Sequence, residues 1–160
     1  MTRQRIAIGL VAVALFVGSM TAQGADFDEG SEAFQRGDYA TALRIFRQLA
    51  AQGNASSQTM MGAMYSEGLG VPQDYGEALK WSRNAADQGD AFAQYNLGQM
   101  YRKGQGVTQD YVLAHMWYNL SAAKDDKIGK NNRDLLAKQM TPAQIAEAQR
   151  LAREWKPKGK

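Results

Sequence analysis

The chain has 160 residues, of which 44% are hydrophobic and none is cysteine. This length suits one ordinary domain, and the hydrophobic fraction is high enough for a buried core, which argues against a disordered protein. The missing cysteines exclude disulfides, thiolate zinc sites and a cysteine nucleophile.

Residues 1–24 have the pattern of a secretory signal peptide. Arg3 and Arg5 supply a positive start, 6–20 form an uncharged and mostly apolar stretch, and small residues precede a cut before Ala25. The apolar stretch is shorter than the roughly 20 residues that cross a bilayer. We therefore expect cleavage, a periplasmic or secreted protein, and no stable membrane insertion afterwards. Retention as a membrane anchor is the alternative.

Cleavage removes most of the apparent basic character. Without Arg3 and Arg5, 17 basic residues stand against 16 acidic ones, so nucleic-acid binding has little support. An asymmetry remains, because residues 25–90 hold 5 basic and 10 acidic residues whereas 91–160 hold 12 and 6. The basic half is either a solvated end with a frayed lysine tail, or a footprint for an acidic partner or an anionic lipid surface.

An internal repeat organises the rest of the sequence. Residues 62–81 align without gaps on 98–117, at an offset of 36. A shorter stretch, 38–53, aligns on 74–89 at the same offset but lacks a glycine-rich insert. We therefore expect the following units: an atypical tetratricopeptide-like first repeat at 25–53, full repeats at 54–89 and 90–125, and a C-terminal cap with a basic tail at 126–160.

Each repeat is predicted to be a pair of helices. In the third repeat, Ala93, Leu97, Met100 and Tyr101 recur at the spacing of one helix face and define its core side. Amphipathic pairs of this kind bury their apolar faces only by stacking on neighbours. The residues expected to form the structural core of the repeats are Gly62, Tyr65, Trp81, Gly98, Tyr101 and Trp117.

The helix ends are marked by glycine and aspartate. Gly104 predicts a left-handed stop, and Asp110 can cap the next helix, as can its counterparts Asp74 and Asp38. Asp74 and Glu77 also have the spacing of a capping box.

Beyond Trp117 the repeat pattern weakens. We expect a polar stretch at 124–132, a short helix at 134–139, and a longer helix opened by Thr141 and Pro142 that runs to about Trp155. The last helix should cover the third repeat. The predicted fold class is all-α: a short solenoid of about three helix-turn-helix repeats with a C-terminal capping helix.

The motif of the third repeat resembles the Sel-one-like repeat (SLR) family, whose units are relatives of tetratricopeptide repeats. It reads Ala-x-x-x-Leu-Gly-x-Met-Tyr-x-x-Gly-x-Gly-Val-x-x-Asp from Ala93 to Asp110. The resemblance covers 55–124 well and 26–53 loosely, and the ending is similar to those of exported bacterial SLR proteins. It implies a right-handed α-superhelix that binds other macromolecules on its concave side. Cysteine-rich SLR proteins are linked to β-lactam binding, but this chain has no cysteine.

No catalytic constellation emerges from the sequence. His115 is the only histidine, so a two-histidine metal site or relay is impossible, and we expect no catalytic residue, metal or cofactor. Three functions stay open. The first is an exported, non-catalytic scaffold for a protein partner of unknown identity. The second is a protein that binds or hydrolyses cell-wall or β-lactam ligands. The third is an accessory module for another protein.

A binding face is predicted from helical geometry. At about 100° per residue, three positions of the third repeat's first helix lie opposite its core face. Because the resemblance implies that first helices line the concave wall, these positions and their counterparts in the second repeat should form one strip. The six residues are Tyr95, Gln99, Arg102, Thr59, Ala63 and Ser66. Tyr95 and Arg102 are the expected anchors. Alternatively, Tyr95 only packs between neighbouring units.

Overall fold

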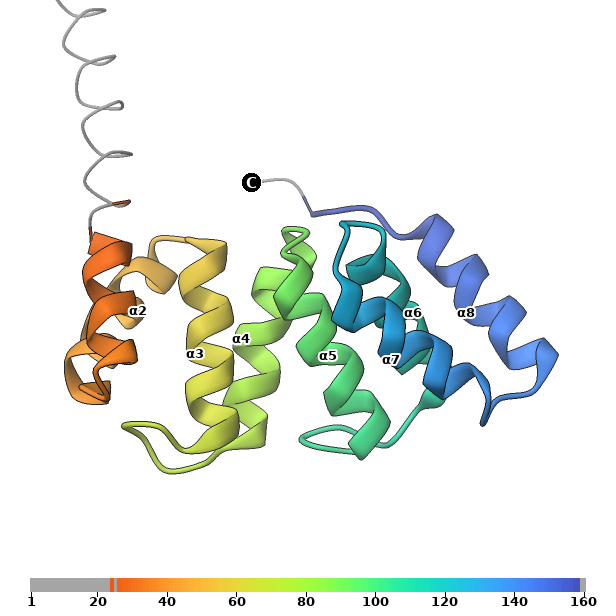
Figure 1. Ribbon diagram of the computed structural model, residues 1–160, viewed down its shortest axis with the longest axis horizontal. Coiled ribbons are helices and arrows are strands. Elements are labelled where there is room, and N and C mark those ends of the chain that lie inside the picture. The colour runs from red at the N-terminus through yellow and green to blue at the C-terminus, as the bar shows by residue number, and fades with distance from the viewer. Residues whose placement is uncertain (1–23, 25, 159–160) are drawn as a thin grey trace, which may run out of the picture.

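The structure, a computed structural model, describes residues 24 and 26–158, and within them the regular secondary structure is entirely helical (Figure 1). The predicted signal peptide falls on 1–24, of which 1–23 lie outside the described residues. Residues 26–35 are helical. The helices that follow are α2 (Tyr39–Ala51), α3 (Ala55–Glu67), α4 (Tyr75–Asp87), α5 (Ala91–Lys103), α6 (Tyr111–Ala122), α7 (Lys127–Ala137) and α8 (Pro142–Glu154). None of the described helices is long and apolar enough to cross a membrane.

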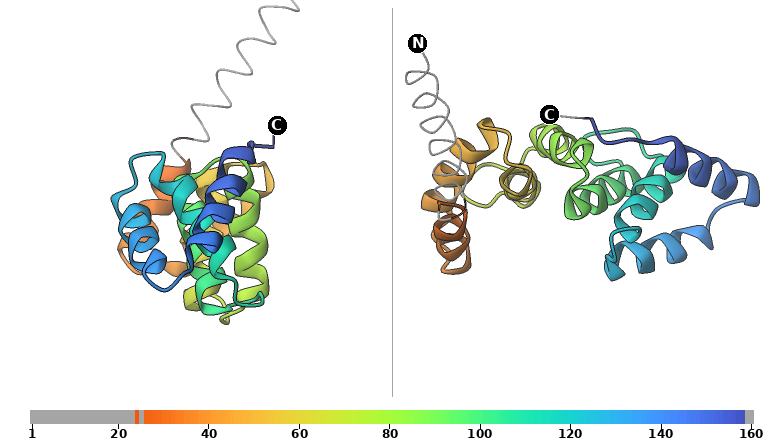
Figure 2. Two further views of the ribbon diagram at one scale, coloured as in Figure 1. Left: turned by 90° about the vertical axis from the view of Figure 1, so that its right-hand side faces the viewer. Right: turned by 90° about the horizontal axis from the view of Figure 1, so that it is seen from above.

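The helices stack in chain order into a solenoid. Each of α2 to α6 packs on the next one along the chain, and α3 and α5 also touch each other directly. The order changes at the C-terminal end, where α7 and α8 both pack on α6 and lie on either side of it (Figure 2). The predicted all-α repeat architecture with a C-terminal capping helix is confirmed.

Caps recur with the repeat. The first helices α3, α5 and α7 begin after Asn54, Asp90 and Asp126, each of which accepts a hydrogen bond from a backbone N–H two or three residues on. Each cap satisfies a free amide of the first turn, and the carboxylates of Asp90 and Asp126 also place negative charge at the positive end of the helix dipole. The three caps are 36 residues apart, so α7 begins where a fourth repeat would begin.

The second helices are capped in the same way. Asp38, Asp74 and Asp110 accept from the first turns of α2, α4 and α6, as the sequence predicts. One detail is wrong, because Glu77 does not complete a capping box with Asp74. Its carboxylate instead pairs with Lys80 at 3.4 Å, an i,i+3 contact on the surface of α4.

Two glycines set how closely helices approach within a repeat. A Cβ on Gly98 would lie 2.5 Å from the ring of Tyr118, so only a glycine lets this ring pack so closely against α5. A Cβ on Gly62 would meet the hydroxyl of Ser82 in the same way. The equivalent glycines thus admit a large ring in one repeat and a small side chain in the other.

The two tryptophans at the repeated position differ in burial. Trp117 is 3% exposed and belongs to the core of the third repeat. Trp81 is only half-buried at the edge of the cluster formed by the first two repeats, where Lys80 lies 5.8 Å from its ring centroid. Trp81 therefore packs against the core as the repeat predicts, but it is less buried than Trp117 at the equivalent position.

The segment after the third repeat is also more helical than predicted. The sequence predicts a polar stretch at 124–132 that leads to a short helix at 134–139, but α7 runs over Lys127–Ala137. Only Gly129 and Leu136 of this helix are buried, so few core residues mark it in the sequence. Asp126 caps it through the backbone N–H groups of Ile128 and Gly129.

The C-terminal helix begins as predicted, and the chain beyond it turns back. Thr141 and Gln144 form a complete capping box with Pro142 at the first turn of α8. After Trp155 the tail returns along the solenoid, and Lys158 reaches α4 of the second repeat. Its backbone N–H donates to the carbonyl of Asp87 at 2.8 Å and its ammonium to the carboxylate at 2.7 Å. The tail thus links the C-terminal cap to the second repeat.

Candidate functional site

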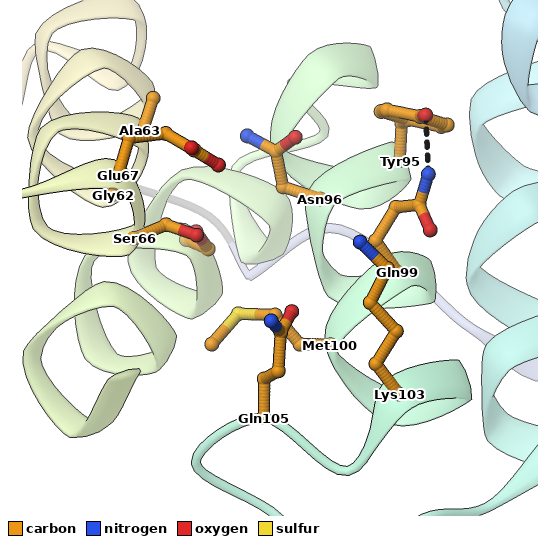
Figure 3. Close-up of a pocket in the computed structure, with 11 residues that line it drawn as sticks. Gly62, Ala63, Ser66, Glu67, Tyr95, Asn96, Gln99, Met100, Lys103 and Gln105 are labelled. Atoms are coloured by element: carbon orange, nitrogen blue, oxygen red, sulfur yellow. Dashed lines mark hydrogen bonds between the residues drawn. The ribbon is translucent and has the colours of Figure 1, made fainter. Parts of the chain in front are cut away.

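A groove of about 220 Å³ lies between the first helices of the second and third repeats (Figure 3). Helix α3 forms one wall and α5 the other, and the close approach at Gly62 brings Ser82 of α4 into the lining. Its lining residues are Gly62, Ala63, Ser66, Glu67, Ser82, Tyr95, Asn96, Gln99, Met100, Lys103 and Gln105. We call this the α3–α5 groove.

The side chain of Tyr95 is held in place on the α5 wall. Its ring packs on Tyr118 with the centroids 5.8 Å apart and the planes at 35°. Gln99 donates to its hydroxyl, and Arg102 donates to the Gln99 oxygen at 3.0 and 3.3 Å. Burial raises the pKa of Tyr118 to about 12, although the nearby Arg102 acts in the opposite direction. Because its ring contacts Tyr118 of the same repeat, Tyr95 packs within its own repeat and also lines the groove.

Most of the residues that line the groove have polar side chains, and these include charges of both signs. Glu67 ends the α3 wall and Lys103 ends the α5 wall, so the groove is acidic on one side and basic on the other. Between them, the amides of Asn96, Gln99 and Gln105 offer both donors and acceptors. Such a lining suits a polypeptide, whose backbone presents one donor and one acceptor at almost every residue.

A second groove lies between α5 and α7. It has a volume of about 390 Å³, and Arg102 lines it from the α5 side. The other lining residues are Asn132, Leu135, Leu136, Lys138 and Gln139. Because α7 begins in register with α3 and α5, this α5–α7 groove is the next inter-repeat groove after the α3–α5 groove.

The six strip residues are divided among three places. Ala63, Ser66, Tyr95 and Gln99 line the α3–α5 groove. Arg102 lines the α5–α7 groove instead. Thr59 is buried and donates to the carboxylate of Asp90 at 3.0 Å, so its place in the strip is wrong. The N-terminus of α5 covers that turn of α3, which helical angles within one helix do not reveal.

The predicted core includes three aromatic residues that differ in burial and in their contacts: Tyr65, Tyr101 and Trp117. Tyr65 is half-buried where the two core clusters meet. Tyr101 is also half-buried, and its hydroxyl accepts from Arg83 of α4. The same guanidinium lies 5.5 Å from the ring centroid of Trp117, so one arginine of the second repeat contacts two aromatic rings of the third.

The single histidine has no access to a substrate. His115 is 2% exposed on α6, and its Nδ1 has no hydrogen-bond partner among the described residues. Burial lowers its pKa and the charge of Arg133 lowers it further, while Asp134 acts in the opposite direction. Across the described residues, no group of three or more histidine, cysteine or acidic side chains could hold a metal ion.

The sequence does not predict that α7 forms a wall of the α5–α7 groove. Asn132 lies in the predicted polar stretch and Leu135 in the predicted short helix, and the sequence pattern gives neither residue a binding role. The spacing of Asn54, Asp90 and Asp126 could have revealed it, since three capping residues at one offset mark three equivalent helix starts.

A comparison with known protein families finds the same three repeats in the chain. The profile of the Sel1 repeat matches residues 27–54, 55–90 and 91–126. The chain belongs to the Sel1 repeat family. Sel1 repeats commonly mediate protein–protein interaction and are generally non-catalytic scaffolds. No curated protein sequence matches the chain.

Two solved Sel1 repeat structures are similar to this one. A protective antigen present in uropathogenic Escherichia coli strains, which displays an SLR fold, is 32% identical with a TM-score of 0.79, and the match covers 83% of this chain. A Sel1 repeat protein from Oxalobacter formigenes is 29% identical with a TM-score of 0.67 over 81% of this chain. The Sel1 repeat protein described here spans only 29% of the first structure and 56% of the second.

Proposed function

We propose that this Sel1 repeat protein is an exported, non-catalytic scaffold that binds a protein partner through the face of its first helices. The observation that carries the proposal is the α3–α5 groove between successive repeats. Most of its lining residues have polar side chains, and on the α5 wall a hydrogen bond from Gln99 holds Tyr95 in place. Family membership supports a role in protein binding. The burial of the only histidine speaks against acid–base chemistry by that residue.

Binding along the first helices follows from what the solenoid leaves free. In α5, one side faces α4 and another faces α6, so Ala93, Leu97 and Gly98 are buried. The remaining side carries Asn96, Gln99 and Lys103, which recur at three- and four-residue spacing and point into the groove. A partner laid across α3 and α5 would therefore meet side chains that are not buried in the core of the solenoid.

The test is affinity capture by three purified versions of residues 25–160. One is the wild type, one carries Ala63→Arg in the groove wall, and one carries Ala146→Arg on the exposed surface of α8 as a matched control. Envelope proteins are captured, identified by mass spectrometry, purified and titrated directly. A partner that binds the wild type and the Ala146 variant but not the Ala63 variant supports the proposal. A partner that is insensitive to Ala63→Arg would contradict it, provided that circular dichroism shows both variants folded.

Export is tested separately. Residues 1–24 have a positive start and an apolar stretch of 15 residues, from 6 to 20, which favour cleavage over retention. Intact-mass analysis of the protein from cell fractions should give a mature chain that begins at or near Ala25 in the envelope or the medium. A full-length chain in the cytoplasmic fraction would contradict export.

A further inference from the structure

The large hydrophobic side chains that the described part of the chain leaves exposed gather on two neighbouring first helices. They are Phe92 of α5 and Ile128 and Leu135 of α7, with exposed fractions of 65%, 53% and 58%. Phe92 and Ile128 occupy the same repeat position, 36 residues apart, and Leu135 has the position of Gln99 in the α3–α5 groove. Residues seven apart share one helix face, so the three side chains extend the groove-bearing face toward the C-terminus.

Positive charge without a counter-ion accompanies this apolar surface. Arg102 and Lys138 line the α5–α7 groove beside Leu135. Neither forms an ion pair with any described residue, and the guanidinium of Arg102 donates to the neutral amide of Gln99. The nearby acids are committed elsewhere, since Asp134 pairs with Arg133 at 2.7 Å and Asp126 caps α7. The charged residues that line the α5–α7 groove are therefore both positive.

We propose that this surface, defined by Phe92, Ile128, Leu135, Arg102 and Lys138, binds an acidic segment of the partner that also carries bulky apolar side chains. This proposal rests on the proposed function and specifies the chemistry of the partner. The apolar side chains of the segment cover Leu135, Ile128 and Phe92. Its carboxylates face Arg102 and Lys138, where complementary charge accelerates association and fixes the register.

A polypeptide fits the groove better than a lipid surface does. Leu135 is flanked by Asn132 and Gln139, whose amides can pair with a peptide backbone along the groove. Part of the surface is also hollowed, because Leu135, Arg102 and Lys138 line the α5–α7 groove of about 390 Å³. Membrane-surface binding relies instead on an apolar helix face that inserts into the headgroup boundary, with cations around it.

The experiment uses a display library of random peptides of about 12 residues, selected on the mature protein and measured by fluorescence anisotropy. Two variants alter the surface: Leu135→Glu removes the apolar contact, and Lys138→Glu reverses a charge of the groove. Their matched controls are Ala146→Glu on α8 and Lys130→Glu, an exposed lysine of α7 that does not line the groove. Vesicles of phosphatidylglycerol and phosphatidylethanolamine form a separate arm, and light scattering reports self-association.

The expected result is a set of peptides rich in Asp or Glu together with Leu, Ile, Phe or Trp. Their affinity should fall at least about tenfold with Leu135→Glu and several-fold with Lys138→Glu, and remain unchanged with both controls. Binding should also weaken as the salt concentration rises from about 50 to 500 mM, because exposed charges are screened.

Three results would overturn the inference. Selected peptides could be neutral or basic and lose binding only with Ala63→Arg, in which case the proposed function would stand and the acidic partner would not. Peptides insensitive to every groove variant would contradict both proposals. Binding only to vesicles, or only to a second copy of the chain, with sensitivity to Leu135→Glu, would replace the peptide by that other occupant.

Discussion

The second and third repeats share one 36-residue pattern but present it to different neighbours. Trp81 and Trp117 occupy the same position, yet Trp117 is 3% exposed whereas Trp81 is half-buried. The ring of Trp117 meets Trp155 edge-on, with centroids 6.2 Å apart, and the guanidinium of Arg83 lies 5.5 Å from its centroid. A repeat position therefore sets which residue is available for packing, while the elements that pack around it decide how far it is buried.

The largest expected effect comes from truncating each tryptophan. Trp117→Ala should lower the free energy of unfolding by about 3–5 kcal/mol, because it removes a buried ring from a packed core. Trp81→Ala should cost about 1–3 kcal/mol, since part of that ring is already in water. Chemical denaturation followed by circular dichroism measures both values. Equal losses would contradict the difference in burial between the two repeats.

The equivalent glycines of the two repeats, Gly62 and Gly98, should also differ in their tolerance of a side chain. Gly98→Ala should destabilise the protein by about 1–3 kcal/mol, because the new methyl group meets the buried ring of Tyr118. Gly62→Ala should change stability by less than about 1 kcal/mol, since the hydroxyl of Ser82 can rotate away and alanine favours the helix. Thermal unfolding of the two variants provides the measurement. A larger loss for Gly62→Ala would show that Ser82 is held more rigidly than Tyr118.

A pH effect from a histidine distinguishes the third repeat from the second, because the counterpart of His115 in the second repeat is Leu79. The folded protein lowers the pKa of His115 below 6.5, so the unfolded chain binds a proton first as the pH falls. Stability is thus complete above about pH 6.5 and decreases as the pH falls below that value. His115→Leu should flatten the stability profile between about pH 5 and 7. An unchanged slope in that variant would assign the titration to another group.

The smallest effect is expected at the contact between the C-terminal tail and the second repeat. The side chain of Lys158 is 78% exposed, so its ion pair with Asp87 should contribute no more than about 1 kcal/mol. Lys158→Ala should lower the melting temperature slightly at low salt and hardly at all at high salt, because screening already weakens the pair. Since the backbone N–H of residue 158 still donates to Asp87, hydrogen exchange at the end of α4 should change little.

The repeat made most of the fold predictable, because its period places caps, glycine stops and core residues together. Gly104 ends α5 in the left-handed conformation with φ of 68°, and Asp110 caps α6, as the sequence indicates. Helix α7 was harder to predict, although Asp126 caps it in register with α3 and α5. Only Gly129 and Leu136 of this helix are buried, and its other large apolar side chains, Ile128 and Leu135, are exposed.

The site was predictable only in part, because it depends on contacts between repeats. Helical angles placed Ala63, Ser66, Tyr95 and Gln99 on an open side of their helices, where the α3–α5 groove lies. They could not show that Asp90 covers Thr59. Nor could they show that Gln94 would be buried, with its amide donating to the carbonyl of Ala86 at 3.4 Å at the end of the previous helix.

The most direct test of the account is site-specific photocrosslinking in living cells, with a photoreactive phenylalanine analogue at one of two glutamine positions. Gln99 lines the α3–α5 groove, and Gln149 is exposed on α8. If the first-helix face binds the partner, light should produce a discrete protein adduct from position 99 and none from position 149, and Ala63→Arg should abolish that adduct. Adducts from position 149 alone, or from both positions regardless of Ala63→Arg, would contradict the account.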